Sequence, residues 1–169
     1  TNLSLRKIDN MNDIYNWNVN DWIVDPVYTN KLDFKNNVYA AYAKYTNSFS
    51  DIDFQFGLRA EYTDRLMTQK SLAKDFKYEK LDFFPSASFS TKIFTDHQIQ
   101  LSYSRRINRP HENLLNPYPF WNTSYAIIYG NPDLKPEFTN SFELNYQKQI
   151  EAVFLSVQTY YRSQSDMIA

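Results

Sequence analysis

The sequence predicts an all-β fold, an antiparallel meander that forms part of a transmembrane β-barrel of an outer membrane. Three observations support this prediction: strands with one apolar and one polar face, connections that alternate between short and long, and an aromatic-rich composition. Of the 169 residues, 18% are aromatic, two are glycine and none is cysteine. Aromatic residues favour two-faced strands over amphipathic helices, and disordered segments lack them.

The clearest predicted strand covers residues 52–63. Its even positions, from Ile52 to Tyr62, are all apolar or aromatic, and none of its odd positions is. Because alternate side chains of a strand point to opposite faces, this run has one apolar and one polar face. Similar alternation over 37–46, 81–93, 98–104, 141–147 and 153–162 gives about six strands within residues 37–169.

One of these runs contains two irregularities. Phe84 breaks the alternation of the 81–93 run, and Pro85 follows it directly. Proline has no backbone N–H to donate to a neighbouring strand, so Pro85 predicts a bulge or a late start of this strand.

The connections between the predicted strands alternate in length. Short ones lie near residues 48–51, 95–97 and 149–151, and long outer loops are predicted at 64–80 and 109–139. In a meander this places all short turns at one end, as in outer-membrane barrels. Strands of about eleven residues at roughly 3.3 Å each also match the apolar band of such barrels when tilted. Residues 1–36 are predicted as an outer loop with a strand end near 3–8.

Five phrases carry a family resemblance. They are GLRAEYT at 57–63, FPSASFS at 84–90, YSRRINRP at 103–110, LNP at 115–117 and GNPDLKPE at 130–137. In this order and spacing they resemble the barrel region of TonB-dependent outer-membrane receptors, particularly the type common in Bacteroidetes, over about residues 36–169. The resemblance implies a bacterial outer-membrane protein that takes up a scarce solute such as a siderophore, glycan, vitamin or peptide.

The sequence also departs from that family. Members of that family form a barrel of about 22 strands around an N-terminal plug, whereas neither a plug nor a TonB box is recognisable in this sequence. The chain is therefore expected to be a fragment that forms barrel wall and extracellular loops. The partners implied are outer-membrane lipid, the rest of the barrel and plug, TonB through the plug, and a surface lipoprotein.

Several other functions find little support in the sequence. With 18 Lys+Arg against 19 Asp+Glu, the near-neutral charge argues against nucleic acid as a partner. No cofactor, metal site or enzyme activity is predicted, because His97 and His111 lack further ligands at metal spacing and no nucleophile motif is present. The alternative is a self-contained small β-barrel or a soluble β-sandwich, acting in binding or adhesion through aromatic loops; sandwich strands also alternate.

Aromatic rings in the second long loop are candidates for ligand contact, because rings offer a large rigid surface. They could equally pack this loop against its neighbours. The candidates are Tyr118, Phe120, Trp121, Tyr125 and Tyr129.

Two further sets of residues are singled out. The GNPDLKPE phrase predicts a rigid structural corner, because its prolines cannot donate and Gly130 is free to take a positive φ. The corner residues are Gly130, Asn131, Pro132, Lys135, Pro136 and Glu137. Residues with the parity of the polar face are predicted to face the lumen: Lys44, Arg59, Glu61, Lys92, Arg106 and Glu143.

Among the arginines, Arg106 is expected to pair with a lumen carboxylate such as Glu61 or Glu143, or with carboxylates of the plug. Arg105 has the opposite parity, and its long stem is expected to reach lipid phosphates.

Overall fold

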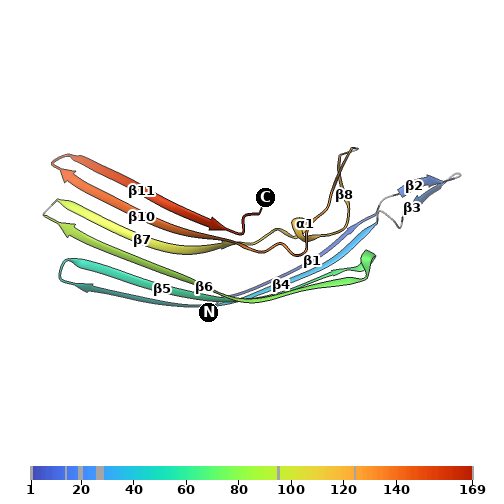
Figure 1. The fold of residues 1–169 in the computed structure, drawn as a ribbon, viewed down its shortest axis with the longest axis horizontal. Helices are drawn as coiled ribbons and strands as arrows, with labels where there is room; N and C mark the ends of the chain where they lie inside the picture. The colour runs from blue at the N-terminus through green and yellow to red at the C-terminus, as the bar shows by residue number, and fades with distance from the viewer. Residues whose placement is uncertain are drawn as a thin grey trace.

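The computed structural model describes residues 2–13, 15–18, 21–25, 29–94, 96–123 and 125–168. Seven strands pair in one antiparallel sheet (Figure 1), in the order β1 (Asn2–Asn12), β4 (Asn30–Phe49), β5 (Ile52–Gln69), β6 (Lys74–Ile93), β7 (His97–Asn108), β10 (Glu137–Ile150) and β11 (Val153–Ser165). The predicted all-β antiparallel meander is therefore confirmed.

The shorter elements lie in the connections between these strands. They are β2 (Tyr15–Asn18), β3 (Asp21–Val24), the 3-10 helix η1 (Lys70–Leu72), α1 (Glu112–Leu115), β8 (Phe120–Thr123) and β9 (Ala126–Ile128). Residues 109–136 are called the β7–β10 connection below. Within the described parts of the chain, no helix is long and apolar enough to cross a membrane.

The sheet contains one strand more than predicted, because residues 2–12 form β1. This strand pairs with β4 from Asn2 opposite Ala40 to Asn12 opposite Asn30. The strand end predicted near 3–8 is thus part of a longer strand, and the prediction of an outer loop is wrong for the rest of β1 and for the start of β4. A ladder joins backbone groups, so a strand with many polar side chains pairs once a neighbour is available.

The predicted loop at 64–80 is also wrong. β5 continues to Gln69, β6 begins at Lys74, and the two strands pair along their whole length. Only η1 and Ala73 lie between them. Charged side chains such as Asp64 end the apolar pattern of the sequence, but they do not interrupt backbone pairing.

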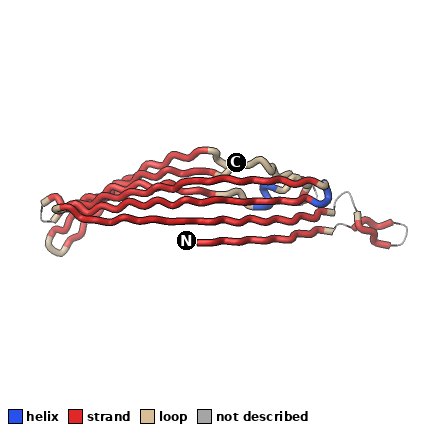
Figure 2. The backbone as a smooth tube through the Cα atoms, turned by 90° about the horizontal axis from the view of Figure 1, so that it is seen from below, coloured by secondary structure: helices blue, strands red, loops and turns tan. Residues whose placement is uncertain are grey.

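The short turns lie together at one end of the curved sheet, as the alternating connection lengths predict. Figure 1 and Figure 2 show the turns between β4 and β5, β6 and β7, and β10 and β11 at the same end. The β2–β3 hairpin and the β7–β10 connection lie toward the other end.

The register places the predicted apolar residues on one face of the sheet, called the apolar face below. Tyr39 lies opposite Tyr62, and Tyr103 lies opposite Phe142. Their ring centroids are 6.3 Å and 4.9 Å apart, respectively. Large side chains of this face remain exposed on the sheet, among them Leu58, Phe83, Leu101, Leu144 and Val157. The opposite face, which carries Glu61 and Ser86, is called the polar face.

Pro85 marks the place where β6 parts from β7. The β6–β7 ladder runs from Ile93 opposite His97 to Ser86 opposite Ser104 and ends there. β6 neither starts late nor shifts its register with β5, so the predicted irregularity takes another form. A residue without an N–H cannot donate to a ladder, which is consistent with pairing on one side ending beside it.

The main apolar core joins the long strands to the β7–β10 connection. Leu32, Phe34, Met67 and Leu115 are buried together, with Phe76 and Leu134 packed against them. Leu115 belongs to α1, so this short helix lies against β4 and β5. Beyond the ladder with β7, the long strands therefore bury their polar face beneath the connection.

Candidate functional site

The β7–β10 connection is joined to the polar face by an arginine at its start. One Nη of Arg109 lies 2.6 Å from the carboxylate of Glu61 and 3.1 Å from the hydroxyl of Thr63. Arg59 contacts the other oxygen of the same carboxylate at 3.3 Å. Glu61 is buried, and two guanidinium groups offset the cost of burying its charge.

A second attachment is made by amide side chains. The Nε2 of Gln69 donates to the side-chain oxygens of Asn30 at 2.8 Å and of Asn116 at 2.9 Å. Gln69 is fully buried, and each of these bonds satisfies a donor that water cannot reach. The three amides join β4, the end of β5 and the residue after α1.

The predicted corner is held by backbone contacts with α1. The N–H of Gly130 donates to the carbonyl of Asn116 at 2.8 Å, and the N–H of Asn131 donates to that of Leu114 at 2.7 Å. The expected positive φ of Gly130 is absent. A Cβ at Gly130 would lie 2.5 Å from the Asn116 carbonyl oxygen. Glycine is required here because two backbones approach closely.

The other corner residues extend this attachment. Asn131 accepts from the N–H of Asp133 at 3.0 Å, and Pro136 is buried. Lys135 is exposed, and Pro132 is partly buried. Glu137 accepts hydrogen bonds from Asn108 and Gln164 on the two neighbouring strands.

A pair of aromatic rings fills the place where β6 parts from β7. Phe84 and Phe138 are both buried, and their ring centroids are 6.5 Å apart. The guanidinium of Arg59 lies over Phe84 at 4.9 Å. Phe138 has Lys80 and Arg105 over its ring, at 4.9 Å and 4.8 Å. Cation–π attraction therefore gathers three positive side chains around the ring pair.

The five predicted ring residues have different environments. Tyr118 is 4% exposed, so its ring packs within the protein, whereas Tyr125 and Tyr129 are 98% and 64% exposed. Phe120 and Trp121 belong to β8, but their side chains lie outside the described residues. Tyr125 and Tyr129 stay candidates for contact with an external ligand.

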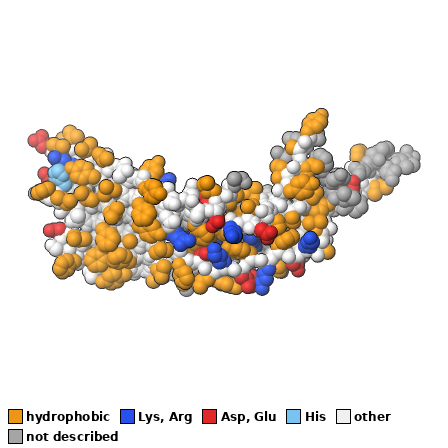
Figure 3. Space-filling view, in the orientation of Figure 1, with side chains coloured by type: hydrophobic (Ala, Val, Ile, Leu, Met, Phe, Trp, Pro, Cys, Tyr) orange, Lys and Arg blue, Asp and Glu red, His pale blue; other side chains and the backbone are white. Residues whose placement is uncertain are grey.

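The six residues predicted to face the lumen share the polar face of the sheet. The register places them there through the pairs of β4 with β5, β5 with β6, β6 with β7, and β7 with β10. They are Lys44, Arg59, Glu61, Lys92, Arg106 and Glu143. Figure 3 shows Lys, Arg, Asp and Glu side chains gathered over the middle of the molecule.

The prediction that Arg106 pairs with Glu61 is wrong. Arg109 binds the Glu61 carboxylate, and Arg106 forms no ion pair within the described part of the chain. The β6–β7 ladder ends at Ser86, before β6 reaches Asp82, the ladder partner of Glu61, and Arg109 of the connection contacts the carboxylate there. Arg105 also departs from the prediction that it reaches lipid phosphates, because its guanidinium lies over the ring of Phe138.

A groove lies between the corner and the ends of β5 and β6 that η1 joins. Its volume is about 450 Å³, and Arg65, Phe76, Tyr78 and Leu134 are among its lining residues. Arg65 is buried, and its guanidinium lies 4.7 Å from the centroid of the Tyr78 ring. Burial lowers the pKa of the Arg65 guanidinium and raises the pKa of the Tyr78 hydroxyl.

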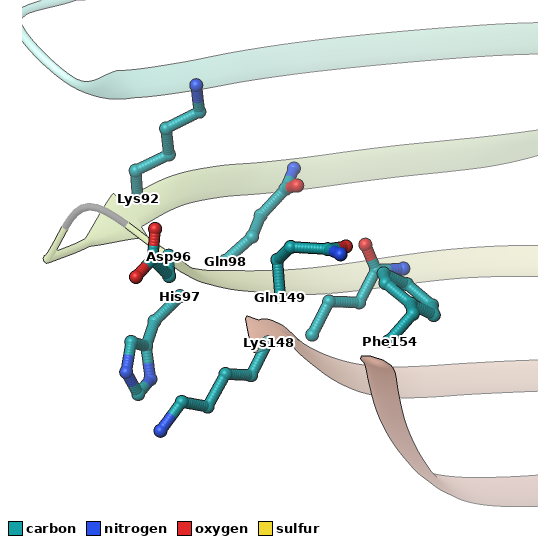
Figure 4. Close-up of a pocket in the computed structure, with 8 residues that line it drawn as sticks. Lys92, Asp96, His97, Gln98, Lys148, Gln149 and Phe154 are labelled. Atoms are coloured by element: carbon teal, nitrogen blue, oxygen red, sulfur yellow. The ribbon is translucent and has the colours of Figure 1, made fainter. Parts of the chain in front are cut away.

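A smaller hollow of about 170 Å³ lies at the short-turn end. Lys92 and Lys148 both line it, but Figure 4 shows them extending in opposite directions, so they do not converge on one anion. The Nδ1 of His97 is 2.7 Å from the Tyr146 hydroxyl. Within the described residues, no group of three His, Asp or Glu side chains is placed to hold a metal ion.

Sequence reasoning missed Arg65 and Tyr78, because both fall in the stretch predicted as a loop. One signal could have found them. The odd positions Arg65, Met67 and Gln69 continue the alternation of β5, with their side chains on the same face as Glu61. Phe84 did give a signal, since it was the one exception to its run. A ring on a polar face requires a packing partner, which here is Phe138.

Two comparisons with known proteins bear on this chain. A family model described as the outer membrane protein beta-barrel family matches residues 1–169. This span includes all strands of the sheet and the whole β7–β10 connection. A comparison with curated proteins gives no match.

Proposed function

Since the chain belongs to the outer membrane protein beta-barrel family, we propose that it forms wall and extracellular loops of a TonB-dependent receptor that takes up a scarce solute. Family membership places the chain in the bacterial outer membrane, with its apolar face against lipid. The proposal adds the receptor type, the energy supply through TonB and the uptake of a siderophore, glycan, vitamin or peptide.

The observation that carries the proposal is the β7–β10 connection folded onto the polar face. Arg109, Gln69 and Leu115 each fix it there by a different kind of contact. A barrel that serves as an open pore keeps its lumen filled with water, whereas a transporter has a lumen occupied by protein. A connection tied to the inside of the wall favours an occluded receptor over an open pore.

The edges of the sheet support a larger barrel. β1 and β11 stand at opposite edges and do not pair with each other in the described residues. Unpaired backbone groups are costly in lipid, so a membrane strand requires a neighbour on each side. Further strands of the same receptor would provide these neighbours, with the plug inside and TonB acting on the plug.

Two measurements on the native protein test this proposal. The first is the intact mass of the polypeptide in a detergent extract of outer membranes, which we expect to be several times 20.2 kDa. The second is binding of that polypeptide to the purified periplasmic domain of TonB, with a porin from the same extract as the control. Failure to bind TonB more than the porin does would contradict the receptor assignment.

The competing function is that of a small self-contained barrel for binding or adhesion. The exposure of Tyr125, between β8 and β9, and of Tyr129, just after β9, favours it, because exposed rings suit contact with a surface or a glycan. This alternative predicts a native mass near 20.2 kDa and no interaction with TonB. A soluble sandwich is not a competitor, because the chain belongs to an outer-membrane family.

A further inference from the structure

The groove between the corner and the ends of β5 and β6 that η1 joins has the dimensions of a ligand site. Its volume of about 450 Å³ falls within the range of small-molecule pockets, about 300–1,000 Å³. Met67, Phe76 and Leu134 line it with apolar surface and belong to the main core or pack against it. The groove is therefore anchored on packed residues of two strands and the corner.

Arg65 is the unusual member of this groove. It is 8% exposed, yet among the described residues no carboxylate pairs with it. A buried charge is costly unless an opposite charge or hydrogen bonds compensate it. The groove thus contains a largely buried positive group with no paired carboxylate among the described residues.

The geometry of Arg65 leaves its hydrogen-bonding edge available. Its guanidinium lies over the ring of Tyr78, with 4.7 Å between the guanidinium carbon and the ring centroid. The N–H donors of a guanidinium lie at the edge of its plane, where they match the geometry of a carboxylate. Arg65 can therefore bind a planar carboxylate through two parallel hydrogen bonds.

Tyr78 contributes an unsatisfied polar group. Its hydroxyl is buried and has no hydrogen-bond partner in the described structure. A buried hydroxyl without a partner is unfavourable, so an acceptor that reaches it gains a hydrogen bond. The two residues lie side by side on neighbouring strands, because Arg65 is directly opposite Tyr78 in the ladder.

The charges that line the groove do not by themselves favour an anion. Arg65, Lys77 and Lys135 line it with Asp75 and Asp133, and one of the lysines is neutralised by a carboxylate outside the groove. Lys77 is already paired with Glu79 at 2.8 Å. Selection of an anion therefore depends on Arg65 and not on the exposed lysines.

We propose that this groove binds the carboxylate of an organic acid, with Arg65 and Tyr78 holding the acid group and Met67, Phe76 and Leu134 contacting a compact apolar body. This inference rests on the proposed receptor function and specifies a class of ligand, an organic acid with an apolar body. The site lies in the outer extension of β5 and β6, beyond the last lipid-facing aromatic of β5, Tyr62.

The test uses the full-length native protein in detergent and 4-fluorobenzoate as the probe, followed by ¹⁹F NMR titration. The neutral isostere 4-fluorobenzamide is the matched probe. We expect 4-fluorobenzoate to bind, and Arg65→Gln to weaken binding about tenfold, the effect of losing one charge-assisted hydrogen bond. Arg65→Lys keeps the charge but loses the planar fork, so it should also weaken binding.

The control variant is Arg162→Gln. The guanidinium of Arg162 also lies 4.7 Å from a tyrosine ring, that of Tyr160, but outside the groove. The Arg162→Gln variant should bind 4-fluorobenzoate as tightly as the wild type does. Tyr78→Phe removes only the hydroxyl and should weaken binding without changing the stacking. Heat-modifiable migration in gels shows which variants fold, and Tyr78→Phe provides the test if Arg65→Gln does not fold.

Three outcomes would overturn the inference. They are no binding of 4-fluorobenzoate to the wild type, equal binding of 4-fluorobenzamide, and unchanged binding in both Arg65→Lys and Tyr78→Phe. Competition by inorganic phosphate as strong as that by benzoate would refute the contribution of the apolar body. Binding to TonB is measured separately, so a receptor that binds TonB but not 4-fluorobenzoate refutes the groove assignment alone.

Discussion

The two glycines of the chain show how residue identity follows from different kinds of crowding. At Gly130 an added Cβ would meet backbone atoms only, the nearest being 2.5 Å, 2.7 Å and 2.8 Å away. At Gly57 the nearest atom, also at 2.5 Å, is the hydroxyl oxygen of Ser86. Backbone atoms of Leu114 and Asn116, at the end of α1, cannot move without moving the chain, whereas a serine side chain changes its rotamer at small cost.

We therefore expect Gly130→Ala to loosen the β7–β10 connection and Gly57→Ala to be tolerated. Overpacking of this kind costs about 1–3 kcal/mol. The measurement is hydrogen–deuterium exchange of the full-length protein in detergent, where Gly130→Ala should speed exchange in residues 109–136. Equal exchange in the two variants would mean that the close approach to Asn116 does not hold the corner.

At the scale of elements, the β7–β10 connection is held on the sheet by a few specific contacts. Arg109 provides the charged contact, at 2.6 Å from Glu61, and Leu115 provides the apolar one. Neither belongs to a regular strand, yet each reaches the polar face of β4 and β5 beyond the level where the β6–β7 ladder ends. The position of the connection thus depends on side chains and not on backbone pairing.

Arg109→Gln should release the start of this connection. It removes a charged hydrogen-bond donor from a buried carboxylate, which costs about 1.5–3 kcal/mol, and leaves Arg59 as the remaining partner of Glu61. Limited proteolysis of the full-length protein should cut the variant faster within 109–136. Arg106→Gln is the control, because Arg106 forms no ion pair in the described structure, and equal cleavage of both variants would argue against the Arg109 contact.

At the scale of the whole molecule, the two faces of the sheet separate lipid contact from polar contact. Leu101 is 49% exposed on the apolar face, and its neighbour Gln100 has the opposite parity, opposite Asn145. A charge on the lipid face near the bilayer centre is unfavourable, whereas the same charge on the inner face is not.

Leu101→Arg and Gln100→Arg are therefore a matched pair. We expect Leu101→Arg to destabilise the folded barrel by about 2–4 kcal/mol and Gln100→Arg to have little effect. Urea titration of the full-length protein in lipid vesicles, followed by tryptophan fluorescence, measures the free energy of unfolding. Equal destabilisation by the two substitutions would contradict the assignment of faces.

Several features were determined by the sequence alone. Alternation in six runs predicts which residues share a face, because side chains of a strand alternate whatever its partners are. The lengths of the connections predict that the short turns share one end, since consecutive strands of a meander run in opposite directions. Even the exception at Phe84 marks a real feature, a buried ring on the polar face.

Only the tertiary structure decided how far the strands continue and what lies on them. The backbone ladder does not depend on apolar side chains, so β1 and the extension of β5 and β6 form where the sequence pattern is polar. The partner of Glu61, the neighbour of Gly130 and the groove around Arg65 all join segments distant in sequence. Pro85 marks where the β6–β7 ladder ends, but no local pattern encodes which side chains of the connection reach the strands beyond it.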